Sequence, residues 1–255
     1  PANGLIYAPS HSCGCYMESL LHGFWALAAA QPTVQTARAA VRDTDRLEKG
    51  PAFGLSVDGR QNEQDWPQLR GNALRNGVTG VALPDVLKQS WNVTLGGKLT
   101  QPVSAGGTVI VASAEKGIVH ALDTADGQRL WQYRAGARVD SPPTIHAGLV
   151  VFGSADGLVT CLRLTDGKLV WRFLAAPAET KTIALDQVAS LWPVHGSVML
   201  LNGVAYCSAG RSTWLDGGIE LYALDPATGR VLHRARYQST HPTIGEGKDQ
   251  ADAKY

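Results

Sequence analysis

Short apolar runs enclosed by glycine-containing turns make up much of this chain. Residues 107–117 read GTVIVASAEKG and residues 148–157 read GLVVFGSADG, so each β-branched run is bounded by small and polar residues. Asp-Gly and Gly turns recur roughly every eight to twelve residues, a spacing typical of meandering antiparallel strands joined by tight hairpins. The pattern therefore predicts an all-β protein.

Tryptophans mark a longer period in the same region. Trp91, Trp131 and Trp171 are spaced 40 residues apart. Four short strands with their turns fit into about 40 residues, which is the length of one β-propeller blade. The period therefore predicts a propeller built from four-stranded antiparallel blades.

The residues around these tryptophans repeat as well. Residues 121–131 read ALDTADGQRLW, residues 161–171 read CLRLTDGKLVW, and residues 223–233 read ALDPATGRVLH. The third copy follows the second after 62 residues instead of 40, so this repeat contains 22 additional residues. His233 stands where the other two copies have tryptophan.

The repeated residues have a structural explanation. An Asp-Gly turn supplies the positive φ that a tight hairpin needs. A tryptophan at a fixed place in each blade can wedge against a glycine or alanine of the next blade. Because the tryptophans recur with the blade, we expect them to pack between blades and not to form a ligand platform.

Several segments carry a resemblance to a known family. Residues 121–131 resemble the repeat of β-propellers of the pyrroloquinoline quinone (PQQ) type, which include quinoprotein dehydrogenases and the propeller lipoprotein of outer-membrane assembly. Residues 65–72 (DWPQLRGN) resemble the opening strand of such propellers. Residues 190–198, 209–212 and 215–218 resemble a group of large PQQ-like repeat proteins of planctomycete-type bacteria. The resemblance implies an all-β propeller with about four or five blades represented.

The repeat divides the chain into four parts. Residues 1–30 are expected to form a partial propeller blade, and residues 31–62 a linker with a possible short helix. Residues 63–237 are expected to form the PQQ-like blades, and residues 238–255 a loop or disordered tail. The chain is interpreted as a fragment of a longer protein, so we expect open blade edges to bind missing blades or to self-associate.

The composition is that of a folded domain whose net charge creates no strong electrostatic field. The chain has 255 residues, 28 glycines, 18 % charged residues and a net charge of +1. The low charge argues against a disordered chain and against nucleic acid as a partner. The longest uncharged stretch, 191–210, is too polar to span a membrane, and the first residues lack a signal-peptide pattern. By resemblance, the expected location is periplasmic or extracellular.

The additional residues of the third copy contain the best site candidates. Insertions in a repeat array usually map to loops on one face, often the binding face. We therefore expect ligand binding at Trp192, His195, Arg211, Ser212 and Asp216. Tryptophan offers a stacking surface, histidine exchanges protons near neutrality, and arginine clamps a carboxylate or phosphate. In the alternative interpretation, Trp192 caps a blade, while Arg211 and Asp216 pair to fix a long hairpin.

The cysteines form a weaker candidate site. Cys13 and Cys15 are two residues apart, which on a strand places both thiols on one face, and His11 precedes them. The three residues could form a structural loop with a local disulfide, bind a metal or serve a redox role, but structural zinc needs four ligands. Cys161 and Cys207 lie in apolar strands and are expected to be buried thiols.

The leading functional hypothesis is a non-catalytic binding or scaffold module. Its expected partner is a protein, or a small-molecule or carbohydrate ligand, at the propeller face, and no cofactor is predicted. The first alternative is a PQQ- or metal-dependent oxidoreductase acting on an alcohol or sugar, with PQQ and calcium. The resemblance would then require a calcium set of Glu, Asn and Asp, which the sequence does not place. The second alternative is a polysaccharide hydrolase or lyase that uses His195, Arg211 and Asp216.

Overall fold

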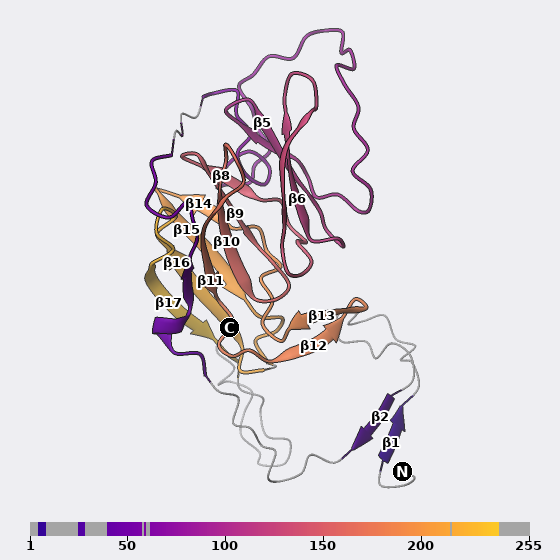
Figure 1. The fold of residues 1–255 in the computed structure, drawn as a ribbon, viewed down its shortest axis with the longest axis vertical. Coiled ribbons are helices and arrows are strands. Elements are labelled where there is room, and N and C mark those ends of the chain that lie inside the picture. The colour runs from indigo at the N-terminus through magenta and orange to yellow at the C-terminus, as the bar shows by residue number, and fades with distance from the viewer. Residues whose placement is uncertain are drawn as a thin grey trace, which may run out of the picture.

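The computed structural model describes residues 5–8, 25–28, 40–57, 59, 62–214 and 216–239. Within these residues, three sheets each contain four strands that are consecutive in the chain, each antiparallel to its neighbours (Figure 1). We call them blades 1, 2 and 3. The expected all-β fold with four-stranded antiparallel blades is therefore confirmed, with three of the four or five expected blades present as four-stranded sheets in the described part.

The strands of the blades are short. Blade 1 contains β4 (Val103–Ala105), β5 (Thr108–Ser113), β6 (Ile118–Asp123) and β7 (Arg129–Arg134). Blade 2 contains β8 (Thr144–His146), β9 (Leu149–Gly153), β10 (Leu158–Arg163) and β11 (Leu169–Leu174). Blade 3 contains β14 (Met199–Leu201), β15 (Val204–Ala209), β16 (Ile219–Leu224) and β17 (Val231–Tyr237). Outside the blades lie β1 (Leu5–Ala8), β2 (Trp25–Ala28), a 3-10 turn η3 (Asp43–Asp45), β3 (Leu47–Lys49), β12 (Lys181–Ala184) and β13 (Gln187–Ser190).

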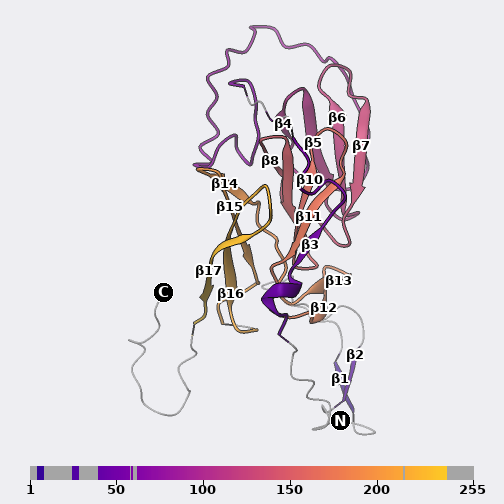
Figure 2. The same cartoon turned by 60° about the vertical axis from the view of Figure 1, so that its left-hand side comes forward.

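The three blades fan out from their innermost strands. Strand β8 contacts both β4 and β14, so the first strands of the three blades lie next to one another. Figure 2 shows the fan, with blade 1 at the upper right and blade 3 towards the left. This arrangement gives every blade two different ends. The turn end carries the hairpins between the third and fourth strands, and the connection end carries the chain from one blade to the next.

The outer strands of blades 1 and 2 each pack against a turn of the next blade through a tryptophan. Trp131 of β7 donates a hydrogen bond from Nε1 to the carbonyl of Leu164 at 2.7 Å. Its indole covers Gly167, where an added Cβ would lie 2.6 Å from the ring. Gly167 also has a φ of 67°, which favours glycine. The turn therefore accepts only glycine without strain, as the repeated Asp-Gly pair predicted.

The same junction occurs twice more. Trp171 of β11 and Trp91, which precedes blade 1, each donate from Nε1 to the carbonyl of the equivalent turn residue, at 3.0 and 2.9 Å. Beneath them lie Gly229 and Gly127, where a Cβ would come within 2.7 Å of the indole. The prediction that the tryptophans pack between blades is confirmed for Trp131 and Trp171, whereas Trp91 makes the same contact with blade 1 alone.

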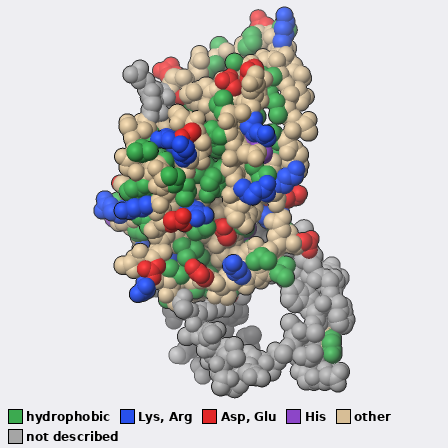
Figure 3. All heavy atoms as spheres, in the orientation of Figure 1, with side chains coloured by type: hydrophobic (Ala, Val, Ile, Leu, Met, Phe, Trp, Pro, Cys, Tyr) green, Lys and Arg blue, Asp and Glu red, His purple; other side chains and the backbone are tan. Residues whose placement is uncertain are grey.

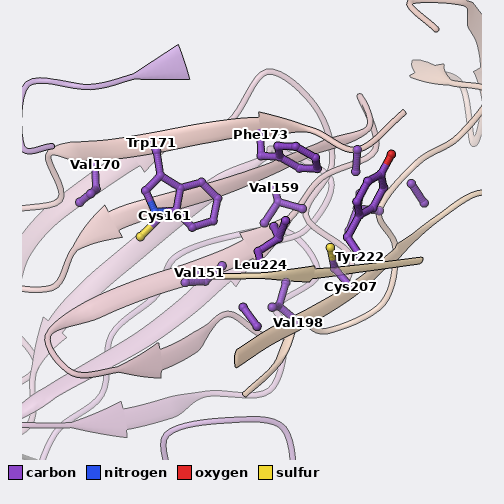
Figure 4. Packing of buried hydrophobic residues seen from close by; sticks show 14 of the residues in the cluster. Val151, Val159, Cys161, Val170, Trp171, Phe173, Val198, Cys207, Tyr222 and Leu224 are labelled. Atoms are coloured by element: carbon purple, nitrogen blue, oxygen red, sulfur yellow. The ribbon is translucent and has the colours of Figure 1, made fainter. Parts of the chain in front are cut away.

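Two hydrophobic clusters fill the spaces between the blades. One lies between blades 1 and 2 and includes Trp131 and Phe152. The other lies between blades 2 and 3 and is shown in Figure 4, where Trp171, Phe173 and Tyr222 come from facing strands. The rings of Phe173 and Tyr222 meet edge to face with 5.0 Å between their centres. Each blade is thus stabilised mainly by its neighbours.

One segment before the blades touches the innermost strands of all three. Trp66 exchanges two backbone hydrogen bonds with β4. The carbonyl of Pro67 accepts a hydrogen bond from β8, and the Gln68 amide bonds both backbone groups of Leu200 in β14. The segment at 66–68 therefore ties the inner edges of the blades together.

A second segment joins blades 2 and 3 from outside. Strand β3 pairs antiparallel with β11 and adds a fifth strand to blade 2. The buried Arg46 donates to the carbonyls of Leu174, at the end of β11, and Ala176. It also donates to Asp43, which accepts a further hydrogen bond from Arg234 of blade 3. This segment lies within 31–62, the stretch that the sequence assigned to a linker, and its described part contains only the short η3 turn as a helix.

The face of the molecule shown in Figure 3 carries no dominant charge. On the face shown in Figure 3, Lys and Arg side chains alternate with Asp and Glu side chains and with hydrophobic ones. Among the residues that the structure describes, no helix is long and apolar enough to cross a membrane.

Candidate functional site

The candidate residues lie at the connection end of the blades. The connection from blade 2 to blade 3 occupies residues 175–198 and includes the β12–β13 hairpin, whereas that from blade 1 to blade 2 needs only 135–143. The hairpin loop between β15 and β16 spans 210–218, against 154–157 in blade 2. The additional residues of the third repeat therefore gather at one end of the molecule, as the insertion argument predicted.

Trp192 is buried between these two loops. Its side chain is only 3 % exposed, and Nε1 donates a hydrogen bond to the carbonyl of Asp216 at 3.0 Å. The guanidinium of Arg211 reaches the carbonyl of Leu191 at 3.4 Å. The backbone N–H of Gly210 donates a hydrogen bond to the carbonyl of Pro193 at 3.0 Å, which joins the same two loops. Trp192 and Arg211 thus fasten the hairpin loop to the connection.

Ser212 and Asp216 shape the loop itself. The Ser212 hydroxyl accepts a hydrogen bond from the backbone N–H of Trp214 at 3.1 Å. Asp216 has a φ of 54°, in the left-handed region that asparagine and aspartate tolerate better than most residues. Both residues are partly exposed, so their side chains border solvent at the connection end.

His195 belongs to a different cluster on the same end. Its Nδ1 lies 3.0 Å from Oδ2 of Asp140, while Arg138 donates to Oδ1 of Asp140 from Nε at 3.0 Å and from Nη2 at 2.8 Å. The hydroxyl of Ser141 donates to the His195 carbonyl. Two successive connections, 135–143 and 175–198, therefore meet through the Asp140–His195 pair.

Asp140 remains an anion in this cluster. Burial raises its pKa, but the hydrogen bonds from His195 and Arg138 outweigh burial, so the pKa lies below its usual value. A carboxylate with a lowered pKa that is already paired is a weak general base. The cluster is better suited to hold the two connections together than to move a proton.

Sequence reasoning missed Arg138 and Asp140. Asp140 stands 55 residues before His195, and nothing in its neighbourhood marks it as a site. The available signal was positional, because 135–143 is the shorter counterpart of the connection that carries His195. In a repeat array such counterparts lie side by side.

The cysteine predictions have different outcomes. Cys161 and Cys207 are buried free thiols, as expected. Burial raises the pKa of Cys207 to about 12 and raises that of Cys161 well above its usual value, so neither is a reactive thiolate. The weak metal candidates His11, Cys13 and Cys15 lie outside the described residues.

Two open grooves lie elsewhere, on the outward faces of the first and last blades. One groove of about 610 Å³ lies on blade 3 and is bordered by Tyr206, Leu221 and His233. The other, about 590 Å³, lies on blade 1 beside Trp66 and Trp91. Both are open sheet faces, and neither contains the candidate residues at the connection end.

Comparisons with known proteins agree on the architecture. A family model described as outer membrane protein assembly factor BamB matches residues 85–243. No curated protein matches the chain. Among solved structures, quinohemoprotein alcohol dehydrogenase ADHIIG from Pseudomonas putida HK5 is similar with a TM-score of 0.57 and 17 % identity, over 73 % of this chain and 29 % of that one.

Two further dehydrogenase structures are similar to the same degree. Quinohemoprotein alcohol dehydrogenase from Comamonas testosteroni has a TM-score of 0.54 and 21 % identity, over 68 % of this chain and 27 % of that one. A europium-containing methanol dehydrogenase has a TM-score of 0.55 and 18 % identity, over 71 % and 33 %. The chain thus spans a third or less of these structures, and at such identities the likeness concerns the fold.

Proposed function

We propose, from the premise that this chain belongs to the BamB family of PQQ-like repeat propellers, that it is a non-catalytic binding or scaffold module. Its partner would be a protein, or a small-molecule or carbohydrate ligand, held at the connection end. The family is named for an outer membrane protein assembly factor, which supports a place outside the cytoplasm, in the periplasm or beyond. The proposed binding surface comprises Arg138, His195, Arg211, Ser212 and Asp216.

One observation carries this proposal: the polar groups at the connection end hold one another in place. Asp140 is paired with Arg138 and His195, and the Trp192 indole is bonded to Asp216. A surface fixed in this way is preorganised for recognition. The partly exposed guanidinium of Arg138 would offer a further N–H donor to a carboxylate or hydroxyl of a partner.

The alternative is a PQQ- or metal-dependent oxidoreductase acting on an alcohol or sugar. The likeness in fold to alcohol and methanol dehydrogenases favours it. Calcium binds six to eight oxygen ligands, commonly from several carboxylates. In the part of the chain that the structure describes, no three His, Cys, Asp or Glu side chains are grouped closely enough to hold a metal ion.

The two functions are separated by reconstitution. The full chain is mixed with PQQ and calcium chloride, or with PQQ and europium chloride, and dye reduction is followed with methanol, ethanol and glucose. We expect no rate above that of the chain without PQQ. Substrate-dependent reduction that requires PQQ would overturn the proposal in favour of the dehydrogenase.

The binding surface is tested by photo-crosslinking. A benzoylphenylalanine replaces Ser212 at the connection end, and in the matched control it replaces the exposed Thr165 at the turn end. Both chains are exported to the periplasm of a Gram-negative host and irradiated. We expect discrete protein adducts from position 212 that Arg138→Ala reduces, and none from position 165. Equal adducts at the two positions would show that the connection end is not the binding surface.

A further inference from the structure

The outer edge of blade 2 shows what the side of a blade can bind. Strand β3 pairs antiparallel with β11 as a fifth strand. The backbone N–H of Gly50 donates to the Val170 carbonyl at 2.8 Å. The carbonyl of Arg46 accepts a hydrogen bond from the N–H of Leu174, also at 2.8 Å. The backbone of β11 is therefore hydrogen-bonded on both of its sides.

An ion pair adds to these backbone bonds. Glu48 of β3 lies opposite Arg172 of β11 in the register. The guanidinium donates to both carboxylate oxygens, from Nε at 3.0 Å and from Nη2 at 2.8 Å. Such a bidentate contact combines charge with a fixed geometry. Blade 2 thus holds its fifth strand through an extended backbone and an acidic side chain.

Blade 1 presents the equivalent edge without a fifth strand. Strand β7 corresponds to β11, with Trp131 at the place of Trp171, and in the described part of the chain it pairs only with β6. Figure 2 shows β7 at the right-hand margin of the blades. By the register of blade 2, the carbonyl of Leu130 and the N–H of Arg134 point away from β6. This edge therefore offers a row of backbone donors and acceptors to a further strand.

The side chains along this edge are basic. Arg129 and Arg134 are both exposed, and within the described residues neither forms an ion pair. Strand β7 itself contains no Asp or Glu. The outer strand of blade 3 differs, because its Arg234 and Arg236 are both paired with the buried Glu220. Blade 1 thus combines an open strand edge with two arginines that have no acidic partner in the described structure.

These charges select what can pair with β7. Two β7 strands from different copies of the chain would bring four arginines to one edge, and like charges on paired strands destabilise the pairing. Charged side chains on an edge strand protect it from its own copies in this way. An acidic strand is instead attracted by the same charges, as Glu48 is by Arg172 in blade 2. The edge is therefore complementary to an extended acidic segment.

We propose that the outer edge of β7 binds an extended, acidic segment of a partner protein, which pairs antiparallel as a fifth strand of blade 1. An acidic residue of this segment lies opposite Arg134, at the place that Arg46 takes opposite Leu174 in blade 2. The interface runs along the side of blade 1. It does not depend on the proposed binding surface at the connection end, so either proposal can fail without the other.

The test uses a peptide copied from β3. The probe is a fluorescein-labelled peptide of residues 44–53 that carries Arg46→Glu, which places a carboxylate opposite Arg134, and the control peptide keeps Arg46. Binding to the full chain is followed by fluorescence anisotropy at about 20 mM salt, where surface charges are little screened. We expect the acidic peptide to bind about tenfold more tightly than the control, and Arg134→Glu in the full chain to reverse the order. No saturable binding, or an order that Arg134→Glu leaves unchanged, would overturn the proposal.

A second measurement tests backbone pairing separately from charge. N-methylation of the acidic peptide at Gly50 removes the N–H that β3 donates to Val170 in blade 2. N-methylation at Lys49 is the matched control, because N–H groups of successive residues in a strand point to opposite sides. We expect the change at Gly50 to abolish binding and the change at Lys49 to preserve it. Equal losses from the two peptides would overturn the strand pairing.

Hydrogen exchange followed by NMR locates the bound peptide and detects other occupants. We expect the amide of Arg134 to exchange about tenfold more slowly when the peptide is bound, and the amide of Leu174 to be unaffected. Slow exchange of the Arg134 amide in the chain without peptide would overturn the proposal. The edge would then be covered by another segment of this chain or, if the protection rises with protein concentration, by a second copy.

Discussion

The turn end and the connection end of the blades follow different rules. At the turn end, the same tryptophan, glycine and carbonyl meet three times with nearly the same geometry. At the connection end, residues 135–143 and 175–198 differ in length and are held by charged clusters instead. The difference teaches that one end of the repeat maintains the packing, which leaves the other end able to accept insertions and charged side chains.

The largest effect is expected from removing an indole at the turn end. Trp171 is fully buried, so Trp171→Ala leaves a large cavity and should lower the free energy of unfolding by about 3–5 kcal/mol. The matched control at the connection end is Trp214→Ala, whose side chain is 44 % exposed and which should cost less than about 1 kcal/mol. Urea denaturation followed by circular dichroism measures both. Equal losses would remove the distinction between the two ends.

A smaller effect distinguishes the backbone cost of a non-glycine residue in the turn from the cost of its contact with the indole. Gly167→Ala introduces a Cβ 2.6 Å from the Trp131 indole at a φ of 67°, whereas Gly203→Ala meets nothing within 4 Å at a φ of 76°. Both changes carry the left-handed backbone cost of about 1–2 kcal/mol, and only Gly167→Ala adds overpacking of about 1–3 kcal/mol. Thermal and urea unfolding compare the pair. If Gly203→Ala proves as harmful, the turn and not the indole contact explains the glycine.

The third prediction concerns a buried charge near the connection end. Glu220 is 1 % exposed and accepts hydrogen bonds from Arg234 at 3.0 Å and Arg236 at 2.5 Å. Burial raises the pKa of Glu220, but the two arginines outweigh burial and hold it below its usual value. Glu220→Gln should therefore cost about 1–3 kcal/mol at pH 7.

The same glutamate predicts a pH dependence. Because its pKa is lower in the folded than in the unfolded chain, its contribution is complete above the unfolded pKa and is lost as the pH falls through the folded pKa. The free energy of unfolding of the wild type, measured by urea between pH 7 and pH 3, should fall more steeply than that of Glu220→Gln. Parallel pH profiles would mean that the glutamate is not held by its arginines.

The repeated part of the fold could be predicted from the sequence because its physics is local and periodic. The 40-residue spacing of Trp131 and Trp171 predicted the length of a blade, and the Asp-Gly turns indicated where a positive φ is required. The placement of additional residues on one end also followed from the repeat. These predictions required only that equivalent residues occupy equivalent positions.

The remaining features depend on contacts between residues far apart in the sequence. Strand β3 pairs with β11 although 120 or more residues separate them, and no periodic signal marks such a pairing. The partnership of His195 with Asp140 likewise joins two connections that the sequence presents separately. A tryptophan such as Trp192 can serve as a stacking surface for a ligand. Here its indole is buried and bonded to the Asp216 carbonyl, so its role is structural.

The segment at 66–68 has a consequence for how the molecule folds and unfolds. In a linear repeat array each unit contacts only its neighbours, so the array can melt one unit at a time. Here Trp66, Pro67 and Gln68 bond the inner strands of three successive blades, across sequence separations of up to 132 residues. Contacts of such high contact order slow the approach to the native state. They also bind the three blades into one cooperative unit, which should lose its structure in a single transition.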